Sequence, residues 1–402
     1  MSAEIQLAKK KTNFDKSKYD DAIRFIHENS GISPEDLKNK SARELINETT
    51  RILSESISQS LQSGLKYEVP ETLTTALREN VFRFSGMKTY HELKEASQLL
   101  LTDKGEIKSF QKFKEDVEKI HSKYNERYLE VEYDFAVHSA QMAVKWNEYE
   151  QDGDEYDLQY RTSGDDKVRA DHAALHGTTL PLSDPFWNAY LPPLDWGCRC
   201  TTVQVLKEKY PASNSAEAQE LGKKATTRMG ADGTNKLAMF RFNPGKEMKI
   251  YPDKHPYMAR SSSPLEVKQA QKVVEGLAEK SATKLLYKEL IGNTIQTEIS
   301  EHNSIGIIKL NSYGLDNFLD RTHSRTYESK LVLKEVLNKK ASIGNPEFEP
   351  LNLNRKNINK KIKKGWEGVN KYTIDAFGKK WEMKTAIIHN RYEVPYCIKR
   401  IP

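Results

Sequence analysis

Apolar residues recur at helical spacing within the first 150 residues, and this pattern constrains the fold most. Between Phe110 and Tyr124 they stand three or four residues apart, so they share one face of a helix. The pattern continues to Trp146. Its members are Phe110, Phe113, Val117, Ile120, Tyr124, Val131, Phe135, His138, Met142 and Trp146. We therefore predict long amphipathic helices, and we interpret His138 as a core residue.

The composition excludes several classes of protein. Apolar residues make up 37% of the 402 residues, yet no apolar run approaches the ~20 residues that a membrane helix needs. The N-terminus carries a lysine cluster and lacks the hydrophobic segment of a secretion signal. Three Cys cannot cross-link a chain of this length. We therefore expect a soluble protein without a membrane span, made in a reducing cytoplasm.

Changes in composition and hydrophobic pattern along the chain predict an α+β protein with four parts. A long helical region comes first, followed by a small α+β module that includes a Thr- and Val-rich strand at Thr201–Leu206. A linker then leads into a helix expected at Leu265–Leu290. The last part is a small basic α+β domain with an antiparallel sheet and an amphipathic segment at Tyr327–Leu337. The predicted boundaries are 1–122, 123–260, 261–284 and 285–402.

Two pairs of metal-ligand residues lie in the second part. A short helix over Arg169–His176 would project His172 and His176 from one face. Cys198 and Cys200 are two residues apart, so they share a face of an extended segment. Together the four side chains form the N2S2 set of a structural zinc site, which we predict here. The alternative is that the histidines cap or pack and that both Cys are small buried apolar residues.

The motifs around these residues resemble the phage Mu protein F family, the minor head (head-morphogenesis) proteins of tailed phages and prophages. The resemblance covers about Lys123 to Tyr257. The matching motifs are Tyr160-Arg161-Thr162-Ser163, Arg169-x-x-His172-x-x-Leu175-x-Gly177, Asp184-Pro185-x-Trp187, Pro192-Pro193, Trp196-Gly197-Cys198-Arg199-Cys200, Phe242-Asn243-Pro244-Gly245 and His255-Pro256-Tyr257.

This resemblance implies a role in head assembly or DNA delivery. The expected partners are the phage portal and other head proteins, and the expected location is the capsid interior of a virion or the bacterial host cytoplasm. The conserved His and Cys positions of the family correspond to His172, Cys198 and Cys200. His176 joins the predicted ligand set from its spacing alone.

Positive charge is concentrated at the C-terminal end. Residues 281–402 contain 22 Lys and Arg against 13 Asp and Glu, whereas the whole chain has a net charge of only +6. The run expected to contact nucleic acid is Arg355, Lys356, Lys360, Lys361, Lys363 and Lys364. Basic runs favour polyanions because each neutralised phosphate releases counterions. The same run could instead form a solvated surface.

The tail, residues 285–402, also resembles in outline the phage-associated nucleases of the Barnase–EndoU–colicin–RelE type. Such a resemblance implies metal-independent RNA or DNA cleavage, for which imidazole and cationic side chains serve in proton transfer and phosphate binding. The catalytic candidates are His323, Arg325, Lys384 and His389. Alternatively, the protein is a purely structural minor head protein whose tail binds DNA or a virion protein without catalysis. An ADP-ribosyltransferase tail is disfavoured because its motif series is missing.

Overall fold

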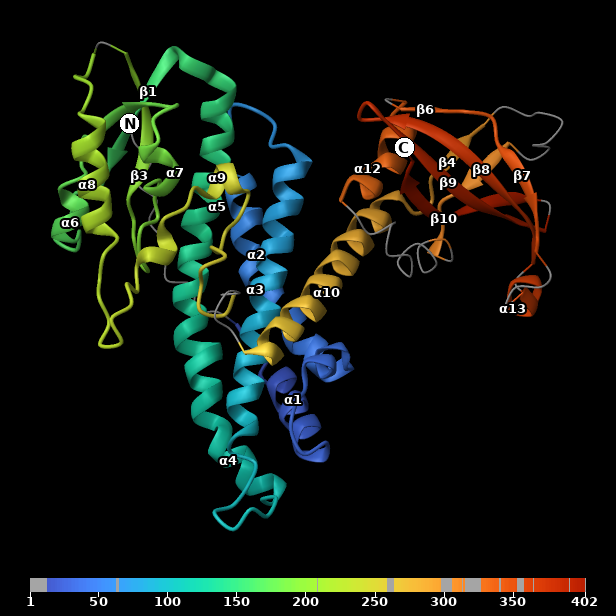
Figure 1. Cartoon of the computed structure of the whole chain (residues 1–402), viewed down its shortest axis with the longest axis horizontal. Coiled ribbons are helices and arrows are strands. Elements are labelled where there is room, and N and C mark those ends of the chain that lie inside the picture. Colours follow the sequence, from blue (N-terminus) through green and yellow to red (C-terminus); the bar gives the residue numbers. More distant parts are fainter. Residues whose placement is uncertain are drawn as a thin grey trace. The chain divides into compact units, whose positions relative to one another are not determined.

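The computed structural model divides the chain into two compact units, Met1–Glu275 and Gly276–Pro402. Both helices and sheets are present, which confirms the α+β class (Figure 1). The division lies inside the predicted linker, and the predicted domain boundaries themselves stay predictions. The described residues are 13–62, 65–207, 209–258, 264–297, 306–312, 314, 327–339, 341–352, 358–363, 365–389 and 391–401.

The first unit is mainly helical, as was predicted for its N-terminal region. No helix among the described residues has the length and apolar character required to cross a membrane. The helices are α1 (Lys16–Glu28), η1 (Pro34–Lys38), α2 (Lys40–Leu61), α3 (Glu71–Ser97), α4 (Phe110–His121), η2 (Ser122–Tyr128), α5 (Leu129–Asp152), η3 (Gly153–Glu155), α6 (Ala170–Ala173), α7 (Phe186–Ala189), α8 (Ser215–Ala225), η4 (Ala238–Phe240), α9 (Pro244–Glu247) and the start of α10 (Leu265–Leu290).

The predicted apolar stripe follows α4, η2 and α5, and its members are buried except for Phe110, which is half-buried, and Val131. Val131 is 42% exposed, whereas Leu129 and Tyr133 are buried in its place. The cause is η2, which is a π-helical turn: its wider winding rotates the following residues relative to an unbroken α-helix. His138 is buried, and its Nδ1 lies 3.1 Å from the carbonyl oxygen of Asp134, which confirms its interpretation as a core residue.

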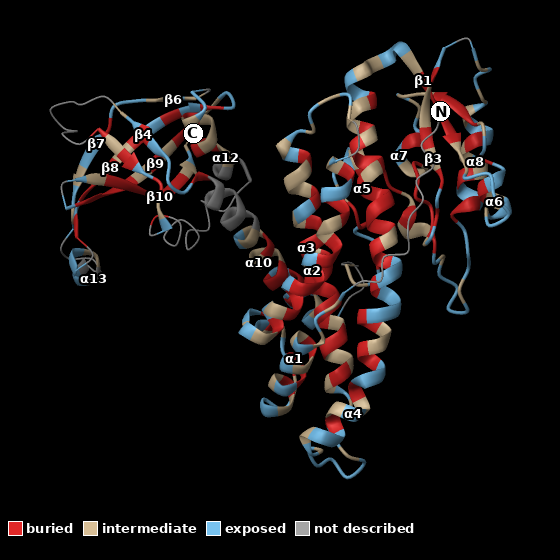
Figure 2. Ribbon diagram, turned by 180° about the vertical axis from the view of Figure 1, so that it is seen from behind, coloured by how far each residue is buried: buried red, intermediate tan, exposed pale blue. Residues whose placement is uncertain are grey.

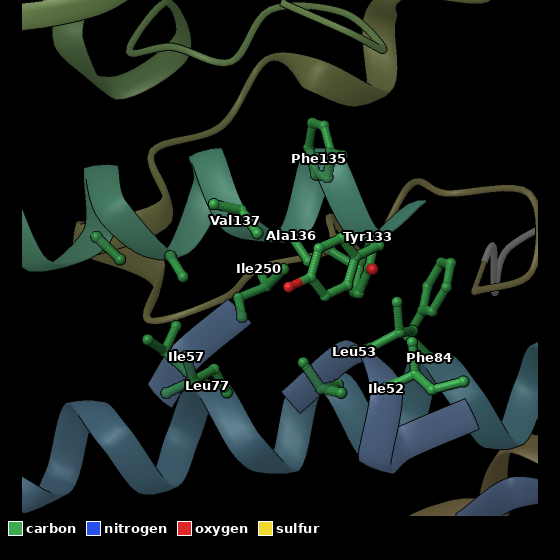
Figure 3. Packing of buried hydrophobic residues seen from close by; sticks show 14 of the residues in the cluster. Ile52, Leu53, Ile57, Leu77, Phe84, Tyr133, Phe135, Ala136, Val137 and Ile250 are labelled. Carbon is green, nitrogen blue, oxygen red and sulfur yellow. The ribbon is translucent and has the colours of Figure 1, made fainter. Parts of the chain in front are cut away.

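The main core of this unit lies between α2, α3 and α5. Ile52, Leu53 and Ile57 from α2 meet Leu77 and other apolar residues of α3 and α5, as Figure 3 shows. Buried residues therefore line the facing sides of these helices, while exposed residues cover the outer sides (Figure 2). Hydrophobic burial of this kind is the main stabilising contribution to folding.

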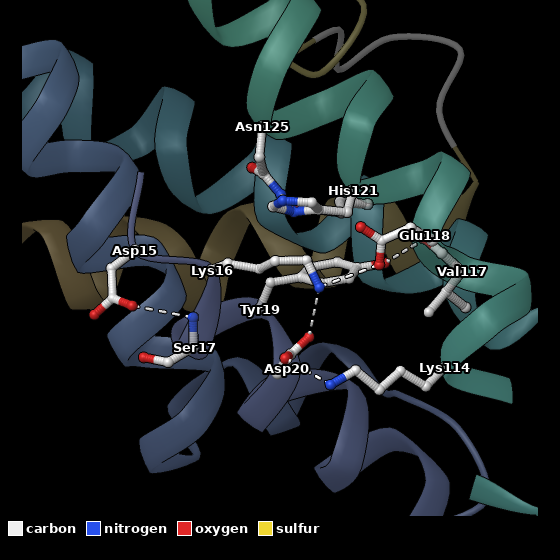
Figure 4. Close-up of polar contacts among 11 residues, drawn as sticks. Asp15, Lys16, Ser17, Tyr19, Asp20, Lys114, Val117, Glu118, His121 and Asn125 are labelled. Carbon is white, nitrogen blue, oxygen red and sulfur yellow. Dashed lines mark hydrogen bonds and ion pairs between the residues drawn. The ribbon is translucent and has the colours of Figure 1, made fainter. Parts of the chain in front are cut away.

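Helix α1 docks onto α4 through both apolar and polar contacts (Figure 4). The Tyr19 hydroxyl donates to the carbonyl oxygen of Val117 over 3.0 Å. Lys16 lies 3.1 Å from Glu118 and 3.2 Å from Asp20. These charged groups are partly exposed, so the ion pairs themselves contribute little, and the buried tyrosine contact sets the position of the helix.

One amide side chain on α3, that of Asn80, holds the segment around Ile250 and Tyr251. The Oδ1 of Asn80 accepts hydrogen bonds from the backbone N–H of Ile250 over 3.0 Å and of Tyr251 over 2.7 Å. Its Nδ2 donates to the Tyr251 carbonyl over 3.0 Å. All of these groups are buried. The ring of Tyr251 then stacks on Phe84 with 3.6 Å between ring centroids.

Replacing Asn80 with alanine should destabilise the first unit by about 2–4 kcal/mol, because two buried backbone N–H groups lose their acceptor. Urea unfolding followed by far-UV circular dichroism measures this loss. Asn188→Ala is the matched control, since Asn188 is exposed and its side chain accepts a hydrogen bond from the exposed end of Lys246 over 2.6 Å. Equal stability of the two variants would contradict the proposed role of Asn80.

Charged side chains are buried where α3, η2 and α5 meet. Lys88 forms an ion pair with Glu132, and their side chains are 0% and 5% exposed. One turn further along α3, Glu92 is also buried and accepts a hydrogen bond from Asn125 of η2. Burial raises the pKa of Glu92 to about 8, although Lys88 and Asn125 oppose this rise. Glu92 is therefore mostly protonated at neutral pH.

The first unit should lose stability as the pH rises from 6.5 to 8. The folded pKa of Glu92 lies above its unfolded value, so its contribution is complete below pH 4.5 and is lost as the pH passes through about 8. Burial lowers the pKa of His91, His121 and His255, so their effects end by about pH 6.5. Glu92→Gln should flatten the curve above that pH in chemical unfolding at several pH values. A slope unchanged by this substitution would refute the assignment.

The small module of the first unit contains a three-stranded antiparallel sheet in the order β2-β1-β3. Its strands are β1 (Tyr156–Arg161), β2 (Thr179–Pro181) and β3 (Thr201–Leu206), so the predicted strand at Thr201–Leu206 is confirmed. Short helices α6, α7 and α8 accompany the sheet (Figure 1). Its separate core includes Trp146, Trp187, Tyr160 and both Cys residues.

The second unit contains a curled sheet in the order β4-β5-β10-β9-β8-β6, with β7 also paired to β8. Among the described strand pairs, β5 and β10 are parallel and the others are antiparallel. The predicted helix α12 packs Val332, Leu333 and Val336 on one face of this sheet. Its elements are β4 (Thr294–Gln296), β5 (Ile307–Lys309), α12 (Tyr327–Leu337), β6 (Ser342–Ile343), β7 (Glu347–Pro350), α13 (Ile358–Lys363), β8 (Trp366–Ala376), β9 (Lys379–Ile388) and β10 (Tyr392–Arg400).

Candidate metal centre

One histidine and two cysteines converge in the small module of the first unit. His172 lies on α6, and Cys198 and Cys200 lie on the turn that leads into β3. The Nδ1 of His172 is 3.6 Å from the sulfur of Cys198 and 3.7 Å from that of Cys200. The three side chains are 2%, 3% and 4% exposed. They form a compact group, in which all ligand atoms lie within 4.8 Å of one another.

A buried acid holds the cysteine turn in place. The carboxylate of Asp195 is 3.4 Å from Arg169 and 3.5 Å from Arg228, and its backbone carbonyl accepts from the Cys198 N–H. Arg169 also donates to the carbonyl oxygen of Trp196 over 2.8 Å. Because Arg169 precedes α6, these contacts tie the segment that carries His172 to the segment that carries the sulfurs. Sequence reasoning missed Asp195, although an acid between Leu194 and Trp196 stands out in an apolar stretch.

Electrostatics separate the two thiols. The pKa of Cys198 lies well below its ordinary value, first because Cys200 donates a hydrogen bond to its sulfur and then because His172 lies beside it. The pKa of Cys200 is raised, because its proton is engaged in that contact and because it is buried. A catalytic thiolate needs access to a substrate, so this buried pair is unsuited to nucleophilic chemistry.

The donor set fits a zinc ion. Two thiolates and one imidazole are ligand types that structural zinc sites use, and the three side chains supply three of the four ligands of such a site. In addition, the His172 Nε2 and the Tyr160 hydroxyl are buried without a well-formed hydrogen bond. Among the described residues, no other His, Cys, Asp or Glu belongs to the group.

His176 does not lie with the group that the spacing argument assigned to it. Helix α6 ends at Ala173, so His172 and His176 do not share a helical face. His176 is exposed, and its Nδ1 accepts from the Thr162 backbone over 3.2 Å. The chain then reverses at Gly177, whose φ of +84° is rarely adopted by other residues. The expected helix over Arg169–His176 was therefore too long.

The comparisons with known proteins concern the same part of the chain. Residues 102–203 match the family model described as "Phage Mu protein F like protein", and this range includes His172, Cys198 and Cys200. These residues are therefore similar to that family. The resemblance derived from the motifs is thus supported, and we call residues 102–203 the Mu F-like region.

Two curated relatives are similar over short segments. The "Mu-like prophage FluMu F protein" of Haemophilus influenzae is 47% identical over 49 residues, which cover 12% of this chain and 12% of the relative. The "Putative capsid assembly protein F" of Escherichia phage Mu is 34% identical over 64 residues, 16% of this chain and 13% of the relative. The chain thus matches about an eighth of the length of each relative. No solved structure matches the chain.

The catalytic candidates of the tail are placed only in part. His323 and Arg325 lie outside the described residues. Lys384 lies within β9, where its Nζ is 3.6 Å from Glu382. His389 follows the same strand, and its ring packs closely against Gly365. Lys384 is separated from the end of β9 by about 13 Å along the strand, so the structure does not bring Lys384 and His389 together.

The residues of the basic run are also only partly placed. Arg355, Lys356 and Lys364 lie outside the described residues, and Lys360 belongs to α13. Lys363 is exposed. The Nζ of Lys361 lies 4.6 Å from the ring centroid of Trp366, a cation–π contact that holds this lysine beside an aromatic residue.

Proposed function

We propose that the protein acts in the assembly of a phage or prophage head as a minor head protein. The observation that carries this proposal is the match of residues 102–203 to the Mu F-like family, together with the similarity to the "Putative capsid assembly protein F" of Escherichia phage Mu. The proposed partners are the portal and other head proteins, and the proposed location is the capsid interior or the host cytoplasm.

The test uses the phage or prophage that carries the gene. Inactivating the gene should yield particles that are defective or absent after induction, and mass spectrometry should detect the chain in purified wild-type heads. Complementation with the intact gene should restore particle formation. Infectious particles produced at normal yield without the protein would overturn the proposal.

We also propose that His172, Cys198 and Cys200 hold a structural zinc ion in the Mu F-like region. A zinc ion supplies strong bonds that tie α6 to the turn before β3. This role is supported by the burial and the short mutual distances of the three side chains. We assign such an ion a structural role because the three side chains that would hold it are buried.

For the tail we propose the nuclease-like activity that its outline implies, with His323, Arg325, Lys384 and His389 as candidates and the basic run as the nucleic-acid contact. Its charge excess supports this second function. The full chain would be incubated with RNA and with DNA, without metal. Cleavage that His323→Ala abolishes would support catalysis. Salt-sensitive binding without cleavage would instead favour the purely structural alternative.

A further inference from the structure

Three neighbouring strands of the second unit carry one row of large apolar residues across the sheet. Trp366 of β8 lies opposite Ile388 of β9, and Ile388 lies opposite Tyr392 of β10. Residues directly opposite one another share a face of a sheet, so the two aromatic rings lie on either side of Ile388. Trp366 and Ile388 are 4% and 5% exposed, and Tyr392 is half-buried. We call these three residues the aromatic row.

A lysine lies over each ring of the aromatic row. The Nζ of Lys361 on α13 is 4.6 Å from the ring centroid of Trp366. The Nζ of Lys309 on β5 is likewise 4.6 Å from the ring centroid of Tyr392. The two lysines are distant in sequence, and the sheet brings them to one row because β5 pairs with β10 while α13 directly precedes β8. Two strand spacings, or about 10 Å, separate β8 from β10.

The charged residues that adjoin the aromatic row are mainly cationic. Lys309 is exposed, and so is Arg391 at the start of β10. Of the two acids that adjoin the row in the sequence, Glu367 is exposed, whereas Glu393 is fully buried and accepts hydrogen bonds within the sheet. An ammonium over an aromatic ring is attracted by it. Each lysine is therefore restricted before it binds, which reduces the entropy lost on contact with an anion.

An exposed imidazole lies at the same end of the sheet. His389 follows Ile388, and its ring packs against Gly365, the residue before Trp366. The His389 N–H donates to the Gly365 carbonyl over 3.0 Å, and the His389 φ is +50°, which is uncommon for a residue other than glycine. One of the catalytic candidates of the tail is thus held next to the aromatic row.

We propose that this surface binds the phosphate backbone of a single-stranded nucleic acid, with Lys309 and Lys361 contacting phosphates on either side of Ile388. Positive charge combined with aromatic side chains is typical of surfaces that bind single strands. The inference rests on the nucleic-acid binding proposed for the tail. It adds Lys309, a contact outside the basic run, and it fixes the path of the strand across β8, β9 and β10.

The salt dependence of binding tests this contact in the full chain. The probes are short, fluorescently labelled single strands of DNA and of RNA whose ribose hydroxyls are methylated, so that cleavage does not interfere. Each phosphate contact contributes about 0.7 to the slope of the logarithm of the binding constant against that of salt concentration. Lys309→Gln should lower this slope by about 0.7 and weaken binding about fivefold at about 0.1 M salt. Lys309→Arg retains the charge and should keep the wild-type slope.

Lys380→Gln is the matched control, because Lys380 is exposed and lies about 26 Å along β9 from Ile388. It should leave the slope unchanged. An effect of Lys309→Gln with one probe alone would identify that nucleic acid as the ligand. If the wild type binds but Lys309→Gln and Lys380→Gln have equal slopes, the assigned surface is wrong, while nucleic-acid binding by the tail stands. If the wild type binds neither probe in a salt-sensitive manner, the proposed function of the tail is wrong and the inference falls with it.

Discussion

Lys88→Met should destabilise the first unit by about 3–5 kcal/mol, because it leaves the Glu132 carboxylate buried without its counter-ion. The Lys88 and Glu132 side chains are 0% and 5% exposed, so water cannot replace the lost partner. Burial already raises the pKa of Glu132, and removal of Lys88 would raise it further. Urea unfolding of the full chain, followed by circular dichroism, measures the change.

The double variant Lys88→Met/Glu132→Leu provides the control. Removing both charges eliminates the unpaired carboxylate, and apolar replacements of buried pairs are often neutral or stabilising. The double variant should therefore recover most of the lost stability, and the two substitutions should be strongly non-additive. Additive losses would show that the two side chains do not depend on each other.

Removal of metal should have the second large effect. We expect about one zinc per purified chain and a clear loss of thermal stability after chelation. At a metal concentration a thousandfold above the dissociation constant, binding contributes ~4 kcal/mol, which corresponds to a fall in melting temperature on the order of 10 °C for a unit of this size. Elemental analysis and calorimetry measure these two quantities.

Single substitutions distinguish the proposed zinc ligands from His176, which the spacing argument alone assigned to the ligand set. His172→Ala and Cys198→Ser should abolish zinc binding, whereas His176→Ala should retain it because His176 is exposed and bonded to Thr162. Cys397→Ser controls for the loss of a buried thiol, since Cys397 belongs to the core of the other unit. The zinc site would be refuted if the chain melted at the same temperature after chelation as it does when purified without a chelator.

Local sequence pattern was sufficient to predict several elements. The predicted helix at Leu265–Leu290 and the predicted strand at Thr201–Leu206 have the predicted bounds, and the amphipathic segment at Tyr327–Leu337 is a helix, because side-chain periodicity reflects which face is buried. The Mu F-like resemblance likewise followed from motifs that are contiguous in the chain. Helical spacing did not reveal the π-helical turn that exposes Val131. The residue types in this stretch do not indicate that one turn of the helix contains an extra residue.

Partners distant in sequence could not be predicted in this way. The sequence around Glu393 is that of an ordinary strand. In the structure, however, Glu393 is fully buried and accepts hydrogen bonds from Asn370 and Tyr372, each over 2.8 Å, and from Thr385. Lys88 and Glu132 are 44 residues apart, and the sequence around either residue contains no motif that predicts their ion pair. Such pairs depend on how helices and strands pack.

The sequence alone determined the element types, the uneven charge and the candidate ligands, because each depends on neighbouring residues. Only the tertiary structure decided which imidazole joins the sulfurs. His172 turns inward and His176 outward because α6 ends after a single turn, and that end is set by the contact between Gly177 and β1. The ligand set is a property of packing between segments, which spacing along one segment cannot specify.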